Sequence, residues 1–205
     1  MGRYTVVITG ASGSVYGMRL TEQLALAGHD VVFVMTEAGR QVTAYELAFE
    51  LPEGNQEAAA VALATFLELP SAERLRVAYA TDLFDGIASG SHPMDAMIVA
   101  PASMGFCGSV AHALALDLPE RAADVCLKER RPLVIVPRET PMSLIHLRNL
   151  TTLAEAGAIV VPAMPAFYQR PQSVDEMVDF VVGKILDVLG VHHDLFDRWG
   201  NSTKA

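Results

Sequence analysis

The opening of the chain alternates short apolar runs with a helical stretch, and this alternation constrains the fold more than any other feature. Residues 4–9 (YTVVIT) and 30–35 (DVVFVM) have the length and the β-branched content of buried strands. Residues 15–27 between them place apolar side chains at helical spacing, and Gly28 follows where that helix should end. A strand, a turn, a helix and a second strand in this order begin a doubly wound parallel sheet.

The same alternation continues along all 205 residues, a length typical of one domain. Further apolar runs read as strands at 75–79, 96–100, 133–136 and 158–161. We therefore predict a single Rossmann-like α/β domain with three α/β/α layers and six or seven strands. It should occupy residues 1–190, and residues 191–205 should form a tail that packs over the site or over a neighbouring subunit.

The turn after the first strand, Gly10–Ser14, consists of small residues. Small residues let the N–H groups at a helix start approach an anion closely, and the helix dipole favours it. The turn spells neither G-x-G-x-x-G nor a P-loop. It is similar to the turn of short-chain dehydrogenases, but its glycines have other offsets and no tyrosine has a lysine four residues later. A dinucleotide reductase is thus disfavoured, whereas a mononucleotide phosphate stays open.

A basic stretch, residues 121–148, lies in the second half of an acidic chain. It holds six of the 15 Lys and Arg residues, namely Arg121, Lys128, Arg130, Arg131, Arg138 and Arg148. A helix is predicted over 122–130, a buried strand over 133–136, and a loop over 137–141 at the carboxyl end of that strand, where open α/β sheets bind ligands. The stretch therefore indicates a site for a phosphate-bearing ligand. For the cations at 128–131 the alternative is a solvated helix end.

Composition restricts the class of function. Apolar residues make up 51% of the chain and charged residues 19%, so a large core or an oligomer must hide apolar surface. The net charge is −9 and acids dominate outside the basic stretch, which argues against a nucleic-acid or anionic-membrane partner. Cys107 and Cys126 give neither a disulfide framework nor metal-ligand spacing. Without a signal peptide or a membrane-length apolar run, a cytoplasmic, metal-free protein is expected.

Three loops that follow predicted strands present chemically useful side chains. Residues 81–92 (TDLFDGIASGSH) form a long loop rich in glycine and serine. Residues 101–105 (PASMG) begin a helix, where Ser103 either caps the helix or binds a ligand, and the pattern leaves both open. Residues 162–171 present an aromatic pair between prolines, before the helix predicted over 174–189.

Six segments together resemble the flavin prenyltransferases, which are flavoproteins long described as aromatic-acid decarboxylases. They are TGASGSVYGMRL (9–20), ASGS (88–91), RAADVCLKERRPLVIVPRETP (121–141), IHLRNL (145–150), AFYQRPQSVDEMVDFVV (166–182) and DLFDRWG (194–200). The resemblance runs nearly end to end, and the two longest blocks are specific. It implies a flavodoxin-like fold, a homododecamer with active sites between subunits, and no need for a metal.

The resemblance also implies a reaction. Such enzymes transfer a dimethylallyl group from dimethylallyl phosphate, or the diphosphate in some members, to N5 and C6 of reduced FMN. The product, prenylated FMN, is the cofactor of a partner family of decarboxylases. By resemblance, FMN contacts fall on Gly10, Ala11, Ser12, Thr36, Ser103, Met104, Gly105, Phe106 and Arg138. Allyl-phosphate contacts fall on Ser89, Arg121, Lys128, Glu139, Tyr168 and Lys184, and Trp199 matches an aromatic residue expected to close over the site.

The catalytic roles implied by the resemblance fall on Glu46, Ser12, Lys128 and Glu139. Cations and hydroxyls around the departing phosphate would stabilise the charge that develops there. Glu46 matches a glutamate that handles protons near the flavin, and burial there would raise its pKa. Two positions depart from the family pattern: Leu83 or Phe84 stands where some members have tryptophan, and Lys184 stands where arginine is common.

Other readings remain open on the sequence. The chain could be an FMN-binding or FMN-delivery subunit of an aromatic-acid decarboxylase system without transferase activity. It could also be a cysteine-decarboxylase-like flavoprotein, although Ser103-Met104-Gly105 replaces the asparagine motif that such proteins need. Direct decarboxylation by this chain has neither a metal site nor a covalent-catalysis pair to support it.

Overall fold

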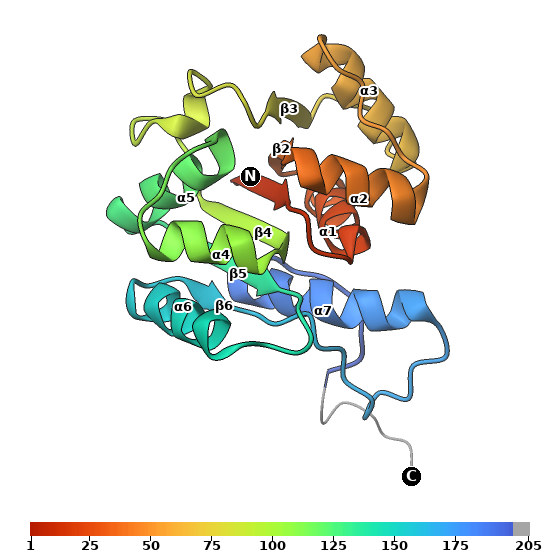
Figure 1. The fold of residues 1–205 in the computed structure, drawn as a ribbon. Coiled ribbons are helices and arrows are strands. Elements are labelled where there is room, and N and C mark those ends of the chain that lie inside the picture. The colour runs from red at the N-terminus through yellow and green to blue at the C-terminus, as the bar shows by residue number, and fades with distance from the viewer. Residues whose placement is uncertain (199–205) are drawn as a thin grey trace.

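Six parallel strands form one sheet in the order β3-β2-β1-β4-β5-β6 (Figure 1). The computed structural model describes residues 1–198. The strands are β1 (Arg3–Ile8), β2 (Asp30–Met35), β3 (Leu75–Tyr79), β4 (Ala96–Ala102), β5 (Leu133–Pro137) and β6 (Ile159–Val160). The strand order reverses between β1 and β4, and open α/β sheets bind their ligands at the carboxyl ends of the strands at such a switch point. The prediction of a doubly wound parallel sheet is confirmed.

Helices cover both faces of the sheet, as a three-layer fold requires (Figure 1). One buried cluster joins the sheet to α1 (Ser14–Leu26), α3 (Gln56–Phe66) and α7 (Val174–Leu189), with α2 (Glu37–Leu47) at its margin. A second cluster joins the other face to α4 (Met104–Ala111), α5 (Leu118–Lys128) and α6 (Leu144–Glu155), with the 3₁₀ turn η1 (Gly86–Ala88). None of the helices within residues 1–198 combines the length and the apolar character that crossing a membrane requires.

One predicted helix starts earlier than the sequence indicated. The helix predicted over 122–130 begins at Leu118, because the Asp117 side chain accepts a hydrogen bond from the backbone N–H of Glu120 at 2.9 Å. Helix α6 begins at Leu144 behind a capping box formed by Ser143 and His146. Other observed boundaries lie within two residues of the predicted ones.

Candidate functional site

The starts of α1, α2 and α4 meet at the carboxyl ends of β1, β2 and β4. Thr9, the residue after β1, links two of them: its Oγ1 donates to the carbonyl of Pro101 at 2.8 Å and accepts from the N–H of Ser103 at 2.7 Å. The N–H of Thr36 donates to the carbonyl of Ile8 at 3.0 Å, which brings the start of α2 to the same place. Three helix N-termini at a switch point form a favourable setting for an anionic ligand.

Thr9 is a residue that sequence reasoning missed, since it reads simply as the last residue of an apolar strand. It is 1% exposed, and both of its side-chain hydrogen bonds reach residues more than 90 positions away. The only local signal was a buried hydroxyl directly before the glycine turn. Its partners could not be identified before the strand order was known.

Thr36 and Ser103 act as helix N-caps. Thr36 Oγ1 accepts from the N–H of Gly39 at 3.1 Å, and Ser103 Oγ accepts from the N–H of Phe106 at 3.2 Å. The capping alternative for Ser103 is therefore confirmed. Because a capping hydroxyl keeps its own proton, it can still donate to a ligand oxygen. Ligand contact by these two residues stays a prediction.

Glu46 reaches from α2 to the start of α1. Its carboxylate accepts from the backbone N–H of Gly13 at 2.9 Å and of Ser14 at 3.0 Å. Burial alone raises the pKa of Glu46, but hydrogen bonds from the Ser12 side chain and from these two N–H groups together outweigh it, so the pKa is lowered. The raised pKa that we expected for Glu46 is thus wrong. The carboxylate itself occupies the anion position at the start of α1.

Arg138 approaches the same turn from the loop after β5. Its Nε donates to the carbonyl of Ser12 at 2.9 Å, and within residues 1–198 its two Nη groups make no hydrogen bond to the protein. A guanidinium held by one edge can present the other edge to a carbonyl or phosphate oxygen. The turn is close-packed as well: a Cβ at Gly10 would lie 2.6 Å from Cβ of Ala38. A side chain at position 10 would therefore push the turn away from the start of α2.

The predicted phosphate-binding residues of α5 gather around the loop that contains η1. Arg121 Nε donates to the carbonyl of Ala88 at 3.3 Å, directly before Ser89, whose hydroxyl bonds that of Ser91 at 2.9 Å. Lys128 pairs with the neighbouring Glu129 at 2.9 Å. Arg121 thus contacts the loop that carries the Ser89 hydroxyl, and binding of a phosphate ester by this group stays a prediction.

Arg131 holds that loop in place. Its guanidinium donates to the carbonyls of His92, at 2.7 Å, and of Gly90, at 2.5 Å. Gly90 packs so tightly that a Cβ would meet Oε1 of Glu129 at 2.4 Å. The two arginines predicted as a ligand-binding pair therefore differ. Arg131 holds the loop through hydrogen bonds, and Arg130 is exposed just after the end of α5.

The remaining predicted phosphate-binding residues lie elsewhere. The Tyr168 ring packs edge-on against Phe180 of α7 with centroids 5.9 Å apart, and Lys184 of α7 pairs with Asp187 at 3.3 Å. Helix α7 and helix α5 cover opposite faces of the sheet (Figure 1). Within residues 1–198, no hydrogen bond or ion pair joins Lys184 or Glu139 to the α5 group. Trp199 lies outside the described residues.

The positions that depart from the family pattern offer no aromatic wall within this chain. Phe84 is fully exposed and Leu83 is about half exposed, at the tip of the loop before η1. Neither packs into the buried clusters.

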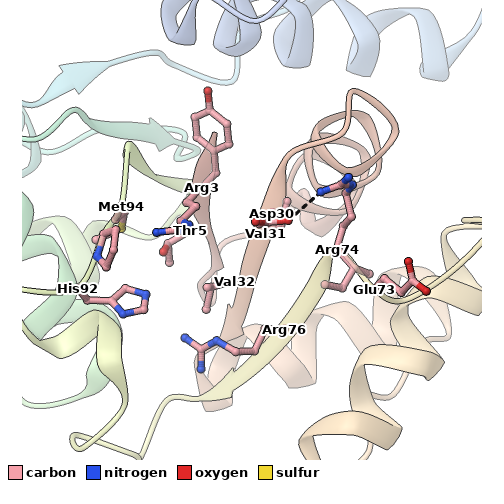
Figure 2. Close-up of a pocket in the computed structure, with 13 residues that line it drawn as sticks. Arg3, Thr5, Asp30, Val31, Val32, Glu73, Arg74, Arg76, His92 and Met94 are labelled. Carbon is pink, nitrogen blue, oxygen red and sulfur yellow. Dashed lines mark hydrogen bonds and ion pairs between the residues drawn. The ribbon is translucent and has the colours of Figure 1, made fainter. Parts of the chain in front are cut away.

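A pocket of about 310 Å³ lies at the amino ends of the strands, opposite the candidate site at their carboxyl ends (Figure 2). Its lining comes mainly from the amino ends of β1, β2 and β3, and includes Arg3, Thr5, Asp30, Val32, Arg74, Arg76, His92 and Met94. Two of its arginines are already paired, Arg74 with Asp30 and Arg76 with Asp85. None of the predicted site residues lines it, so it is separate from the candidate site.

Comparisons with known proteins agree with the geometry. The Flavoprotein family model matches residues 2–186. Flavin prenyltransferase UbiX from Halalkalibacterium halodurans is 46% identical over 201 residues, which cover 97% of this chain and 94% of that protein.

Two solved structures have the same fold over nearly their whole length. The crystal structure of AnUbiX (PadA1) in complex with FMN and dimethylallyl pyrophosphate has a TM-score of 0.85 at 33% identity and covers 98% of both chains. A dodecameric FMN-dependent UbiX-like decarboxylase from Escherichia coli O157:H7 has a TM-score of 0.83 at 34% identity, covering 97% of this chain and 100% of that one.

Proposed function

The chain belongs to the flavin prenyltransferases of the Flavoprotein family, and from this premise we propose the reaction that it catalyses. It transfers a dimethylallyl group from dimethylallyl phosphate to N5 and C6 of reduced FMN. The observation that carries this proposal is the convergence of Glu46 and Arg138 on the turn Gly10–Ser14, at the switch point of the sheet. A proton acceptor and a free guanidinium edge thereby lie where a flavin would bind.

The residues that would hold FMN surround that turn. The starts of α2 and α4 offer backbone N–H groups and the N-cap hydroxyls of Thr36 and Ser103 to the phosphate and ribityl oxygens. Arg138 offers its two Nη groups. When bound, reduced flavin supplies two nucleophilic ring positions. The carboxylate of Glu46, charged at neutral pH because its pKa is lowered, accepts a proton next to them.

The α5 group acts on the other substrate. As the allylic C–O bond breaks, negative charge grows on the departing phosphate, and fixed cations lower the free energy of that transition state. Arg121 and Lys128 supply the charge, and the hydroxyl of Ser89 supplies a hydrogen-bond donor. We propose that Lys184 and Glu139 contribute from a second subunit, since within residues 1–198 no hydrogen bond or ion pair joins them to the α5 group. Tyr168 packs on the same helix as Lys184 and is proposed to contribute with it.

A homododecamer is proposed for the same reason. Many large apolar side chains are exposed in the single chain, among them Phe84, Leu144, Ile145, Met164, Phe167 and Val174. Assembly would bury them, and a dodecamer is described for the Escherichia coli relative. Light scattering should show an assembly far above 22.0 kDa. A monomer that is fully active would contradict the shared site.

Anaerobic incubation with reduced FMN and dimethylallyl phosphate, followed by mass spectrometry of the released flavin, tests the reaction. A flavin heavier by one C5H8 unit is expected. Unmodified FMN, with the diphosphate tried as well, would contradict the proposal and favour an FMN carrier. The product is proposed to serve a decarboxylase that depends on prenylated FMN, and activation of such an apo-decarboxylase by the released flavin is the corresponding assay.

A further inference from the structure

The segment that follows α7 turns back and packs on that helix. Gly190, with a φ of +68°, ends the helix, and residues 191–198 run back along it. A Cβ at Gly183 would lie 2.4 Å from Cε1 of Phe196 and 2.7 Å from Cε1 of His193, so no side chain can separate helix and segment. The Phe196 ring also lies 5.2 Å from that of Phe180. We call residues 191–198 the clasp.

One carboxylate lies at the centre of the polar contacts between the clasp and the helix. Oδ1 of Asp187 accepts from Nη2 of Arg198 at 2.9 Å and bonds Nε2 of the buried His193 at 3.2 Å. Its Oδ2 has a different partner, Nζ of Lys184, at 3.3 Å. Oδ1 of Asp187 therefore holds the clasp, and Oδ2 holds Lys184.

The clasp also reaches the loop that carries Tyr168. Nε2 of Gln169 donates to the carbonyl of Asp197 at 2.8 Å, and the Tyr168 ring packs on Phe180, which in turn contacts Phe196. Two residues predicted to bind the allyl phosphate, Tyr168 and Lys184, are thus attached to the same eight-residue segment through short chains of contacts.

We propose that Asp187 is a positioning residue for the phosphate site, which links the placement of Lys184 to the ordering of the clasp. A lysine side chain has four rotatable bonds, and Lys184 is about half exposed, so an anchor is needed to keep Nζ in one place. This inference rests on the proposed function, because Lys184 matters only if the substrate is a phosphate ester. Asp187 touches neither substrate in this account and acts through Lys184.

The test compares Asp187→Asn with Asp175→Asn, a matched change of an exposed acid in the first turn of the same helix. Asparagine keeps an oxygen for Arg198 and His193 but presents an NH₂ group to Lys184. We expect KM for dimethylallyl phosphate to rise about fivefold, the scale of one partly exposed ion pair, with kcat and the FMN dissociation constant unchanged. Asp175→Asn should leave all three constants unchanged. Asp187→Glu, which keeps the negative charge, should raise KM less than Asp187→Asn does.

Two further measurements distinguish a positioning role of Asp187 from a general structural role. In a Lys184→Ala background, Asp187→Asn should raise KM no further. Hydrogen exchange of a peptide spanning 191–198 should be faster in Arg198→Gln, and that variant should also raise KM for dimethylallyl phosphate.

Several outcomes would overturn the inference. These are a fall in KM, which would mean that Asp187 competes with the phosphate, an equal rise in the Lys184→Ala background, and a wild-type KM in Asp187→Asn. If the wild-type protein itself formed no prenylated FMN, the proposed function would fail first. An active wild type with an unaffected Asp187→Asn would remove this inference alone.

Discussion

The glycine-turn region and the phosphate-binding groups are held together by different kinds of contact. Around the turn, backbone groups and short side chains join the ends of three strands, as in the two bonds of Thr9 Oγ1 at 2.7 and 2.8 Å. The predicted phosphate-binding cations instead lie on long side chains, each paired with an acid close in sequence. These pairs are Arg121–Asp124, Lys128–Glu129 and Lys184–Asp187.

This difference has an energetic meaning. Pairs as exposed as these contribute only about 0–1 kcal/mol each, so at Arg121 and Lys128 a bound phosphate can replace the acid at little cost, whereas Asp187 is proposed to keep its hold on Lys184. The Thr9 side chain at the turn is buried, and losing its hydroxyl leaves the N–H of Ser103 without a partner. We therefore expect the proposed flavin side to be preorganised and the proposed phosphate side to be completed by its ligand and by a second subunit.

The largest effect is expected at Lys128. Lys128→Ala should lower kcat for prenyl transfer by about 100- to 1,000-fold, because a fixed charge on the departing phosphate is lost. FMN binding should be unchanged, since Lys128 is remote from the turn. Stopped-flow or mass-spectrometric assays give kcat, and flavin fluorescence gives the dissociation constant. Arg130→Ala, at the exposed end of the same helix, is the matched control, and unchanged turnover in Lys128→Ala would remove Lys128 from the mechanism.

Mixing two variants tests whether the phosphate groups come from different subunits. Lys128→Ala and Lys184→Ala should each be impaired alone. If each site takes Lys128 and Lys184 from different chains, about a quarter of the sites in a randomly mixed assembly carry both lysines. Co-expression should therefore restore about that fraction of wild-type turnover. No recovery in mixed assemblies would place both lysines in one chain's site.

The sheet could be predicted from the sequence because apolar runs with β-branched residues need only local periodicity to be recognised. Residues 75–79 and the helix over 174–189 have the predicted boundaries. The start of α5 was missed because Asp117 and Pro119, which define it, lie before the helical periodicity becomes clear. Local patterns predict elements, whereas caps decide where they begin.

The candidate site residues could be named through the family resemblance, but the directions of their pKa shifts and their long-range hydrogen bonds could not be predicted. Glu46 was expected to have a raised pKa because burial was the only cause that the sequence made visible. The opposing hydrogen bonds come from Gly13 and Ser14, which lie more than 30 residues away. Likewise, the structural role of Arg131 depends on carbonyls of residues 90 and 92, which no local pattern connects to it.

On the preorganised side, Glu46→Gln should lower kcat by about 100-fold, because the amide keeps a hydrogen-bond acceptor but cannot take up a proton. The lowered pKa of Glu46 fixes the sign of its pH dependence. The carboxylate is charged above its ordinary pKa, and its stabilising bonds are lost only as the pH falls through the lowered value. Glu46 should therefore not titrate between about pH 5 and 8, so the pH dependence of kcat/KM in this range should have the same shape in the wild type and in Glu46→Gln. A limb near neutral pH that disappears in the variant would contradict this.

A smaller effect is expected at Arg138. Arg138→Lys keeps the charge but loses the fork that bonds Ser12 through Nε and leaves both Nη groups for a ligand. The FMN dissociation constant should rise about tenfold, with KM for dimethylallyl phosphate nearly unchanged. Flavin fluorescence titration measures the first and steady-state kinetics the second. Arg148→Lys on α6 is the matched control, and equal FMN affinity in both variants would mean that Arg138 only holds the turn.

The smallest effect on turnover, and a clear effect on stability, is expected at Thr9. Thr9→Val keeps the shape of the side chain but leaves the N–H of Ser103 without its partner, while the carbonyl of Pro101 keeps only the bond from the backbone N–H of Thr9 at 3.2 Å. Leaving this donor unpaired should lower the free energy of unfolding by about 1–3 kcal/mol, while kcat of the folded enzyme changes by less than about twofold. Urea unfolding measures the first, and Thr9→Ser, which keeps the hydroxyl, should recover most of it. If Thr9→Val were as stable as the wild type, the turn region would not depend on this link. The contrast with the replaceable ion pairs of the phosphate side would then lose its basis.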